Sequence, residues 1–212
     1  MHDYQLARDR ERRVIKAPKK YAYADLIAYA LTAAHELDYD EPKSYKEVVS
    51  GKNADQWLEA MKEEMDSLYK NDTWTLVRKP DKKKVVRCKW VYKLKQGITG
   101  VEPVRFKARL VAKGFTQKKG IDFTEVFSPV VRHASIRIIL SLVAVNNMHL
   151  EQMDVKTVFL HGELQEYIVM AQPEGFTDKS KVDWVCHLKK SLYGLKQSPR
   201  QWYLRFDSFM LE

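Results

Sequence analysis

Two segments in which basic and apolar residues alternate constrain the fold of this chain most. Residues 85–95 place apolar side chains at every even position from 86 to 94 and basic side chains at 87, 89, 93 and 95. Residues 104–113 repeat the alternation, with basic side chains at 105, 107 and 109. A period of two is typical of a strand with one buried face. With the Gly- and Pro-containing turn at 97–103, the pattern predicts a long hairpin with one basic face.

The positive charge of the chain is concentrated around this hairpin. Residues 78–119 hold fifteen basic and two acidic side chains, a net charge of +13, whereas the 212-residue chain has a net charge of +9. A folded basic surface of this kind favours a polyanion partner, and nucleic acid fits best. The alternative is a solvated two-stranded ribbon with lysines on its open face.

Helical spacing predicts helices on both sides of the hairpin. The polar and basic residues 1–20 are expected to form an arm, followed by a helix over 21–37 and a short turn capped by Ser44 and Glu47. Further helices are predicted over 55–70, over 135–146 and from Pro199 onward. In the 55–70 helix the expected buried side chains are Trp57, Met61, Met65 and Leu68. In the 135–146 helix they are Ile136, Ile139, Leu140, Val143 and Ala144.

Short apolar runs predict strands at 73–77, 148–155, 167–171 and 182–189. The 148–155 run ends at Asp154, and Phe159 follows five residues later. A carboxylate at a strand end could hold a divalent cation, with the ring beneath a nucleotide sugar. The alternative is a solvated aspartate and a core phenylalanine.

Composition excludes several classes of protein. The chain is long enough to bury a core, and no apolar run approaches the roughly 18 residues that cross a bilayer. Its charged N-terminus does not resemble a signal peptide. The two cysteines, Cys88 and Cys186, are too few and too far apart for a disulfide framework or a cysteine zinc site. We therefore expect an intracellular protein, cytoplasmic or nuclear, that is neither secreted nor membrane-bound.

Five sequence blocks then occur in an order that identifies a family. They are Trp90-Val91-Tyr92-Lys93, residues 107–115 (KARLVAKGF), residues 125–130 (EVFSPV), residues 152–162 (QMDVKTVFLHG) and residues 191–200 (SLYGLKQSPR). Together they closely resemble the reverse transcriptase of copia-type LTR retrotransposons, with plant members nearest. The resemblance covers residues 57–212, and more loosely the segment from Tyr21.

This resemblance implies an α+β fold with the fingers and part of the palm of a right-hand polymerase. We expect a basic arm and linker over 1–54 and a reverse transcriptase domain over 55–212. Asp154 would be the catalytic carboxylate and metal ligand, shared by two Mg²⁺ ions. The nucleotide-binding residues implied by the family are Lys107, Arg109, Phe159 as the gate against the ribose 2′-hydroxyl, Tyr193 and Gly194. The residues expected to contact nucleic acid are Lys89, Lys93, Lys95, Lys113, Lys196 and Arg200.

Two features of the sequence depart from the family pattern. Val158 stands where the family usually has alanine, and its extra bulk beside the gate predicts weaker nucleotide binding. The family's Tyr-Xaa-Asp-Asp motif, which supplies two further carboxylates, is absent from the 212 residues. We therefore expect this chain alone to be inactive, poorly soluble or partly molten.

Two hypotheses for function follow. The first is a fragment of an RNA-directed DNA polymerase that performs Mg²⁺-dependent nucleotidyl transfer when complete. Its partners would be an RNA or DNA template–primer, deoxynucleoside triphosphates and the remainder of the Pol polyprotein. The second is a catalytically dead transposon relic that only binds nucleic acid through the basic hairpin. A steep salt dependence of binding is expected for either.

Overall fold

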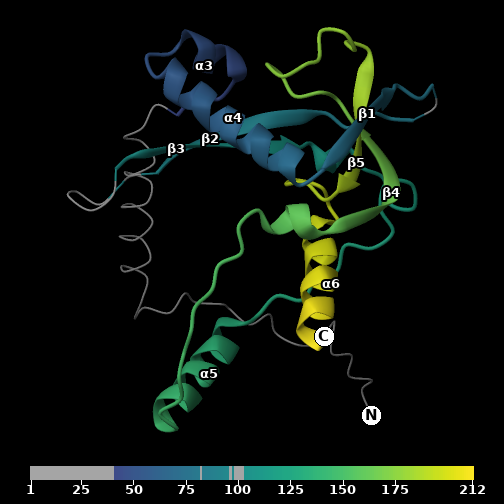
Figure 1. Cartoon of the computed structure of the whole chain (residues 1–212). Coiled ribbons are helices and arrows are strands. Elements are labelled where there is room, and N and C mark those ends of the chain that lie inside the picture. Colours follow the sequence, from purple (N-terminus) through teal and green to yellow (C-terminus); the bar gives the residue numbers. More distant parts are fainter. Residues whose placement is uncertain (1–40, 82, 96, 98–102) are drawn as a thin grey trace, which may run out of the picture. The chain divides into compact units, whose positions relative to one another are not determined.

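A computed structural model describes residues 41–81, 83–95, 97 and 103–212 (Figure 1). The predicted arm, the predicted helix at 21–37 and most of the 97–103 turn lie outside these ranges. The described elements are α3 (Tyr45–Ser50), α4 (Ala54–Lys70), β1 (Trp74–Arg78), β2 (Cys88–Lys95), β3 (Arg105–Ala112), η1 (Gly114–Thr116), α5 (His133–Val145), η2 (Val158–His161), β4 (Glu163–Met170), β5 (Trp184–Lys190) and α6 (Ser198–Leu211). This mixture of helices and strands agrees with the predicted α+β class.

The α4 helix buries the apolar stripe that its sequence predicts. Trp57, Met61, Met65 and Leu68 are all at most 5% exposed. The ring of Trp57 meets those of Tyr92 and Phe106 edge-on, with centroids 5.4 and 4.8 Å apart. Full burial of a large apolar side chain contributes about 1.5–3 kcal/mol. These contacts therefore hold α4 on the apolar face of the hairpin.

The chain enters α4 through α3, whose start also agrees with the sequence. The Glu47 amide donates to the Ser44 hydroxyl oxygen at 3.3 Å, and the Lys43 amide donates to the Glu47 carboxylate at 2.7 Å. Val48 of α3 is fully buried. Residues 41–54, which we assigned to a linker, thus include packed structure, and the division into domains stays a prediction.

The β2 and β3 strands form the predicted hairpin. They pair antiparallel in an unbroken register from Cys88 opposite Ala112 to Lys95 opposite Arg105. Trp90, Tyr92 and Leu110 are buried, whereas the basic side chains that alternate with them are exposed. The hairpin thus has one apolar face in the core and one basic face outside it.

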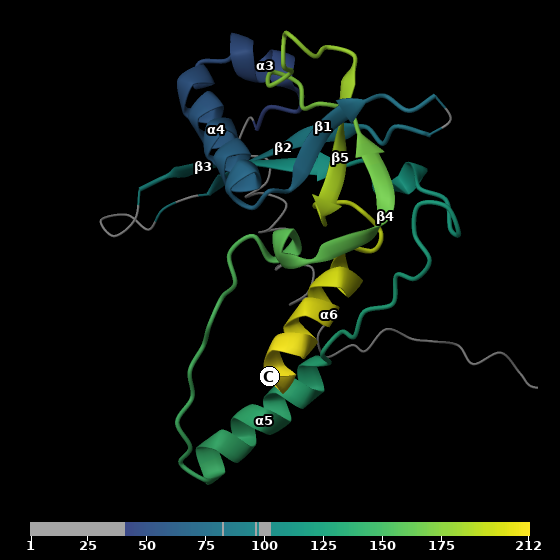
Figure 2. The same cartoon turned by 45° about the vertical axis from the view of Figure 1, so that its right-hand side comes forward.

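A second sheet gathers strands from distant parts of the sequence. Its order is β1-β5-β4, with antiparallel pairing throughout, and Figure 2 shows β5 between its two neighbours. A bridge between Val86 and Met170 connects the chain just before β2 to this sheet. Met170, Cys186 and Leu188 are buried in the same core as α4 and the hairpin. Both sheets therefore share one hydrophobic core.

The predicted strand at 148–155 is wrong. These residues form no strand, and Met148, Leu150 and Met153 are 58%, 57% and 87% exposed. An extended segment becomes a strand only when a neighbour satisfies its amides and carbonyls. No described strand pairs with this segment, so it remains an irregular connection.

The α5 helix agrees in position with the predicted 135–146 helix, but its predicted burial is wrong. Ile136, Ile139 and Leu140 are 43%, 56% and 45% exposed, Val143 is half-buried, and Ala144 is exposed. Helical periodicity shows which side chains share a face, but not whether another element covers that face. In the described part of the chain, α5 has no buried residue.

None of the helices in the described residues is long and apolar enough to cross a bilayer.

Candidate nucleotide-binding site

A cavity of about 550 Å³ lies between α4, the outer edge of β3 and the irregular segment after α5. It brings together residues that are far apart in the sequence. The lining residues are Ala60, Glu63, Glu64 and Ser67 from α4, Phe106, Lys107, Ala108 and Arg109 from β3, Asp154, Val155, Lys156, Thr157 and Val158, and Tyr193. Four of the predicted site residues, Lys107, Arg109, Asp154 and Tyr193, thus line one cavity.

Two aromatic rings and one guanidinium group contact one another in a row at one side of this cavity. The Arg109 guanidinium carbon lies 5.5 Å from the centroid of the Tyr193 ring, within cation–π range. Tyr193 in turn meets Phe159 in a T-shaped contact, with centroids 5.0 Å apart. Phe159 of η2 does not itself line the cavity but supports Tyr193 from behind. These two contacts limit where the Arg109 side chain can lie.

The segment that carries Asp154 turns sharply before η2. Thr157 has a φ of +53° and a ψ of +39°, a left-handed conformation that is strained for a β-branched residue. Just beyond it, the His161 ring hydrogen-bonds to the Lys156 carbonyl at 3.2 Å. Asp154 itself is exposed. The sequence offered no signal for this turn, because threonine is uncommon in left-handed backbone.

Two glutamates of α4 face the basic residues across the cavity. Glu63 is exposed, whereas Glu64 is half-buried and accepts a hydrogen bond from the Leu110 amide at 3.2 Å. Burial raises the pKa of the Glu64 carboxyl above its usual range, while this amide and the Arg109 and Lys107 cations oppose the shift. Sequence reasoning missed both residues, because the α4 pattern drew attention only to its apolar stripe.

Gly194 makes a close approach to protein backbone. Its φ is +88°, and a Cβ atom there would collide with the Ala112 carbonyl oxygen and the Val111 side chain. Nearby, the Ala112 amide donates to the Tyr193 carbonyl at 2.7 Å. The absence of a side chain at Gly194 therefore lets the turn pack against the base of the hairpin. Its expected role in nucleotide binding stays a prediction.

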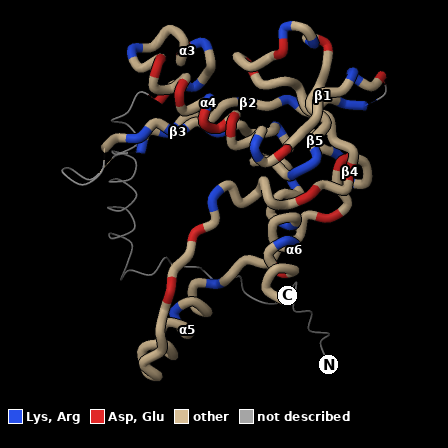
Figure 3. The backbone as a smooth tube through the Cα atoms, in the orientation of Figure 1, with Lys and Arg blue, Asp and Glu red and all other residues tan. Residues whose placement is uncertain are grey.

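The remaining basic residues are distributed along the length of the hairpin (Figure 3). Lys89, Lys93 and Lys95 are exposed, and Lys93 lies directly opposite Lys107 in the register. The Lys93 ammonium has Glu41 as an ion-pair partner at 3.4 Å. Lys113 is half-buried at the hairpin base. The predicted nucleic-acid contacts on β2 therefore share one surface.

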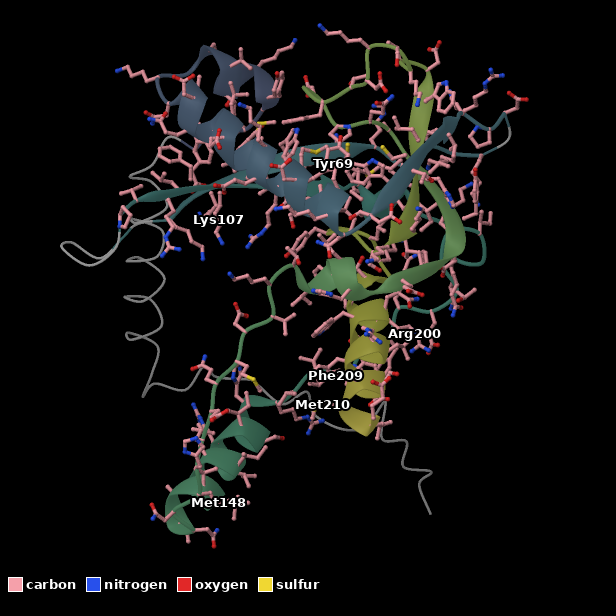
Figure 4. The ribbon with its side chains drawn as sticks, viewed as in Figure 1. Tyr69, Lys107, Met148, Arg200, Phe209 and Met210 are labelled. Carbon is pink, nitrogen blue, oxygen red and sulfur yellow. The ribbon has the colours of Figure 1, made fainter. Side chains whose placement is uncertain are left out.

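Lys196 and Arg200 lie elsewhere and already have protein partners. The Lys196 ammonium donates to the Gln117 carbonyl at 3.1 Å and lies 4.9 Å from the centre of the Phe123 ring. Arg200, at the start of α6 (Figure 4), pairs with the Glu125 carboxylate at 2.7 Å. These contacts tie α6 to the 117–127 segment. A nucleic-acid role for either residue stays a prediction.

Buried glutamines complete this junction, and sequence reasoning did not single them out. The Gln117 amide group donates to Gln197 at 3.1 Å, and Gln197 donates to the Asp122 carbonyl at 2.9 Å. All three residues are at most 5% exposed. Buried polar side chains with satisfied hydrogen bonds specify one arrangement of their segments. The network therefore holds the turn that contains Tyr193.

Asp154 is the predicted metal ligand, and its surroundings set a limit on metal binding. Within the residues that the structure describes, no group of three His, Cys, Asp or Glu side chains could hold an ion together. A metal-binding role for Asp154 stays a prediction.

The chain is similar to known proteins over most of its length. A family model described as reverse transcriptase (RNA-dependent DNA polymerase) matches residues 71–212. The chain is 59% identical over 173 residues, 82% of its length, to a Nicotiana tabacum protein, the retrovirus-related Pol polyprotein from transposon TNT 1-94. It is 38% identical over 197 residues, 92% of its length, to the retrovirus-related Pol polyprotein from transposon RE2 of Arabidopsis thaliana.

A more distant relative comes from yeast. The truncated transposon Ty1-A Gag-Pol polyprotein of Saccharomyces cerevisiae is 31% identical over 183 residues, 83% of the chain. The chain spans only 13% of the length of each plant polyprotein and 14% of the yeast one. No solved structure matches. The family model covers well over half of the chain, and we conclude that this chain belongs to the reverse transcriptase (RNA-dependent DNA polymerase) family.

Proposed function

We propose that the cavity between α4 and β3 receives an incoming deoxynucleoside triphosphate during RNA-directed DNA synthesis. One observation carries this proposal: Lys107, Arg109, Asp154 and Tyr193 line the same cavity. Two cations, a carboxylate and an aromatic ring match the triphosphate, its metal and its sugar or base. The whole polymerase would be a retrotransposon Pol polyprotein, whose other segments are the proposed partners of this chain.

In this proposal, the hairpin with α4 forms the fingers of a right-hand polymerase, and the β1-β5-β4 sheet belongs to the palm. The 550 Å³ cavity then lies where fingers and palm meet, which is where a polymerase must hold both nucleotide and primer end. The proposed setting is the cytoplasm or nucleus, because template RNA and DNA are found there.

Reverse transcriptases usually require a divalent metal, and the chemistry of Asp154 fits Mg²⁺. Its carboxylate is exposed and lines the cavity. Mg²⁺ is commonly held by one or two carboxylates together with substrate phosphates, so a single protein ligand suffices to orient a metal–nucleotide complex. The bound cation would neutralise charge on the phosphates and activate the attacking hydroxyl, with two ions in the complete polymerase.

Lys107 and Arg109 would bind the phosphates and stabilise the negative charge that develops on the leaving pyrophosphate. Both line the cavity, and Arg109 is held over Tyr193. A cation that is already positioned needs little reorganisation during the reaction. The two residues would therefore contribute to the chemical step as well as to binding.

Phe159 and Tyr193 would select the sugar. Tyr193 lines the cavity, and the Phe159 ring, which does not line it, meets Tyr193 with centroids 5.0 Å apart. Phe159 would therefore act as the gate against the ribose 2′-hydroxyl through the position in which it holds the Tyr193 ring, and so favour deoxynucleotides. Gly194 would act indirectly, because its contact with the hairpin base keeps Tyr193 in place.

The exposed hairpin face would hold the template strand. Lys93 and Lys107 face each other across the strands, and the Lys93 ammonium also pairs with the Glu41 carboxylate at 3.4 Å. Like charges directly opposite each other destabilise a hairpin. A bound phosphate backbone would relieve that repulsion. Binding of nucleic acid without catalysis, the second candidate function, rests on this same observation.

A binding measurement with three variants tests the nucleotide site. Titration of the 212-residue chain with Mg·dTTP should give saturable binding that Asp154→Asn and Arg109→Ala each weaken by about tenfold, the usual effect of losing one charge-assisted contact. Asp183→Asn, which removes an exposed carboxylate outside the cavity, should leave the affinity unchanged. Equal affinities for all four proteins would refute the nucleotide site. Nucleic-acid binding with no Mg·dTTP binding would support the second candidate.

A substitution next to the gate refines this test. Val158 lines the cavity, where the family usually has the smaller alanine. Val158→Ala should strengthen Mg·dTTP binding, because it removes two methyl groups beside the sugar pocket. An unchanged dissociation constant would show that the valine does not restrict the site.

A further inference from the structure

The two glutamates of α4 in the cavity wall differ in their contacts. Glu63 is exposed and is not seen to hydrogen-bond within the described residues, whereas Glu64 is half-buried and accepts the Leu110 amide. They are adjacent, line the same cavity and carry the same charge. Two features distinguish them: Glu64 has the contact with the Leu110 amide, and it lies closer to the influence of the Arg109 and Lys107 cations.

The Glu64 contact acts on the outer edge of β3. Leu110 pairs with Trp90 of β2 on one side, and its amide points away from β2 toward α4. A two-stranded hairpin is marginally stable by itself, and its outer edges carry unpaired amides and carbonyls. The carboxylate of Glu64 satisfies one of these amides and links strand to helix within the cavity wall.

Arg109 is the neighbour of the anchored residue, and Lys107 lies two positions further along the same strand. Successive residues of a strand are about 3.3 Å apart and held in a stiff backbone. An anchor at the Leu110 amide therefore limits where both cations can lie. The Arg109 contact with Tyr193, at 5.5 Å, is the second constraint on the same side chain.

The charge of Glu64 makes this role unexpected. A carboxylate in the wall of a cavity for a triphosphate should repel the ligand, so charge alone predicts that removing it strengthens binding. A positioning role predicts the opposite sign. The two explanations can therefore be separated by the direction of one measured change.

We infer that Glu64 is a positioning residue, which holds the edge of β3 through the Leu110 amide so that Lys107 and Arg109 face the triphosphate. This inference rests on the proposed nucleotide site. It predicts that the hydrogen-bond acceptor of Glu64 favours nucleotide binding although its charge opposes it.

Two matched pairs of variants of the 212-residue chain test the inference with Mg·dTTP as the probe. Glu64→Ala should weaken binding about three- to tenfold, an indirect effect of the size of one ordinary hydrogen bond. Glu63→Ala removes a cavity-wall charge without removing a hydrogen bond seen among the described residues, so it should bind more tightly than wild type. Glu64→Gln keeps an acceptor oxygen without the charge, so it should bind at least as tightly as wild type, as should Glu63→Gln.

Hydrogen exchange of the Leu110 amide gives a measurement that does not depend on the ligand. Exchange should accelerate in Glu64→Ala and remain slow in Glu63→Ala. Binding is measured at a temperature where circular dichroism shows each variant folded. A purely structural role would lower the unfolding midpoint of Glu64→Ala and leave its dissociation constant unchanged.

The outcomes distinguish a failure of the positioning role of Glu64 from a failure of the proposed nucleotide site. If wild type binds Mg·dTTP but Glu64→Ala binds equally well, only the positioning role is overturned. If Glu64→Gln loses as much affinity as Glu64→Ala, the acceptor is not responsible and the inference also fails. If wild type does not bind Mg·dTTP, the proposed function fails and the positioning role fails with it.

Discussion

At the scale of single residues, the site is shaped by backbone conformations that the side chains do not favour. Thr157 adopts left-handed backbone between Asp154 and Phe159. Strain of this kind persists where the surrounding structure enforces it, and it is frequent at functional sites. Here the turn brings the segment that carries Asp154 up to the cavity before η2 begins.

Thr157→Asn should stabilise the chain. Asparagine tolerates left-handed backbone better than a β-branched residue, and the relief is about 0.5–1 kcal/mol. Urea unfolding followed by circular dichroism would measure the change. Thr75→Asn, at an exposed position in β1, is the control and should be neutral or destabilising, since asparagine is disfavoured in strands. A loss of stability in Thr157→Asn would contradict this account.

Two glycines separate the cost of backbone conformation from that of close contact. Gly120 has a φ of +80°, and a Cβ atom added there would meet no heavy atom within 4 Å. Gly194 has a similar φ, but a Cβ atom added there would collide with the hairpin base. Gly120→Ala should cost about 1–2 kcal/mol for left-handed backbone. Gly194→Ala should cost a further 1–3 kcal/mol for overpacking. Equal losses in thermal unfolding would show that the contact with Ala112 is unimportant.

At the scale of elements, the hairpin combines a stabilising face with a destabilising one. Its apolar face packs beneath α4, while its basic face places Lys93 opposite Lys107. Like charges directly opposite each other disfavour the pairing of the strands, and the Glu41 carboxylate, 3.4 Å from the Lys93 ammonium, offsets only part of this cost.

Lys107→Glu should therefore raise the unfolding midpoint and weaken binding to single-stranded RNA. The slope of log K against log[salt] should become shallower by about 0.7, the contribution of one lost phosphate contact on a single strand. Lys52→Glu, at an exposed position after α3, makes the same charge change and is the control. Binding that is independent of salt in the wild type would refute the role of the hairpin face.

At the scale of the whole molecule, the core and the exposed helices should respond differently to substitution. Leu68 is 1% exposed, whereas Ile139 on α5 is 56% exposed. Leu68→Ala should cost about 2–5 kcal/mol. Ile139→Ser should change stability by less than about 0.5 kcal/mol. It should nevertheless reduce self-association and dye binding, because exposed apolar side chains promote both.

The expectation of a poorly soluble chain has a structural basis in these exposed side chains. Besides those of α5, Met148, Phe209 and Met210 are 58–64% exposed (Figure 4). A monomer that melts sharply and binds no hydrophobic dye would contradict the expectation.

The cysteines report on the integrity of the core. Burial raises the pKa of Cys186 to about 12 and that of Cys88 to about 11. Below these values both groups remain thiols, so native Cys186 should resist alkylation at pH 8 and react only when the core opens. Urea should accelerate the labelling of Cys186 in step with unfolding. Rapid labelling of the native protein would show that the reagent reaches Cys186 without unfolding of the core.

The sequence by itself determined the local structure and the family. Alternation specified the two faces of β2 and β3, and the spacing of Trp57, Met61 and Met65 specified the buried face of α4. These patterns succeed because a strand or helix presents its side chains with a fixed period. The five sequence blocks, found in the order of the family, likewise needed no structure to indicate a reverse transcriptase.

Only the tertiary structure decided which residues meet. It placed Glu64 against Leu110, gave Gly194 a backbone neighbour and engaged Arg200 with Glu125. It also left the 148–155 segment without a strand partner and the apolar face of α5 uncovered. Periodicity describes one element at a time, whereas pairing, burial and hydrogen bonding between distant segments depend on how the whole chain packs.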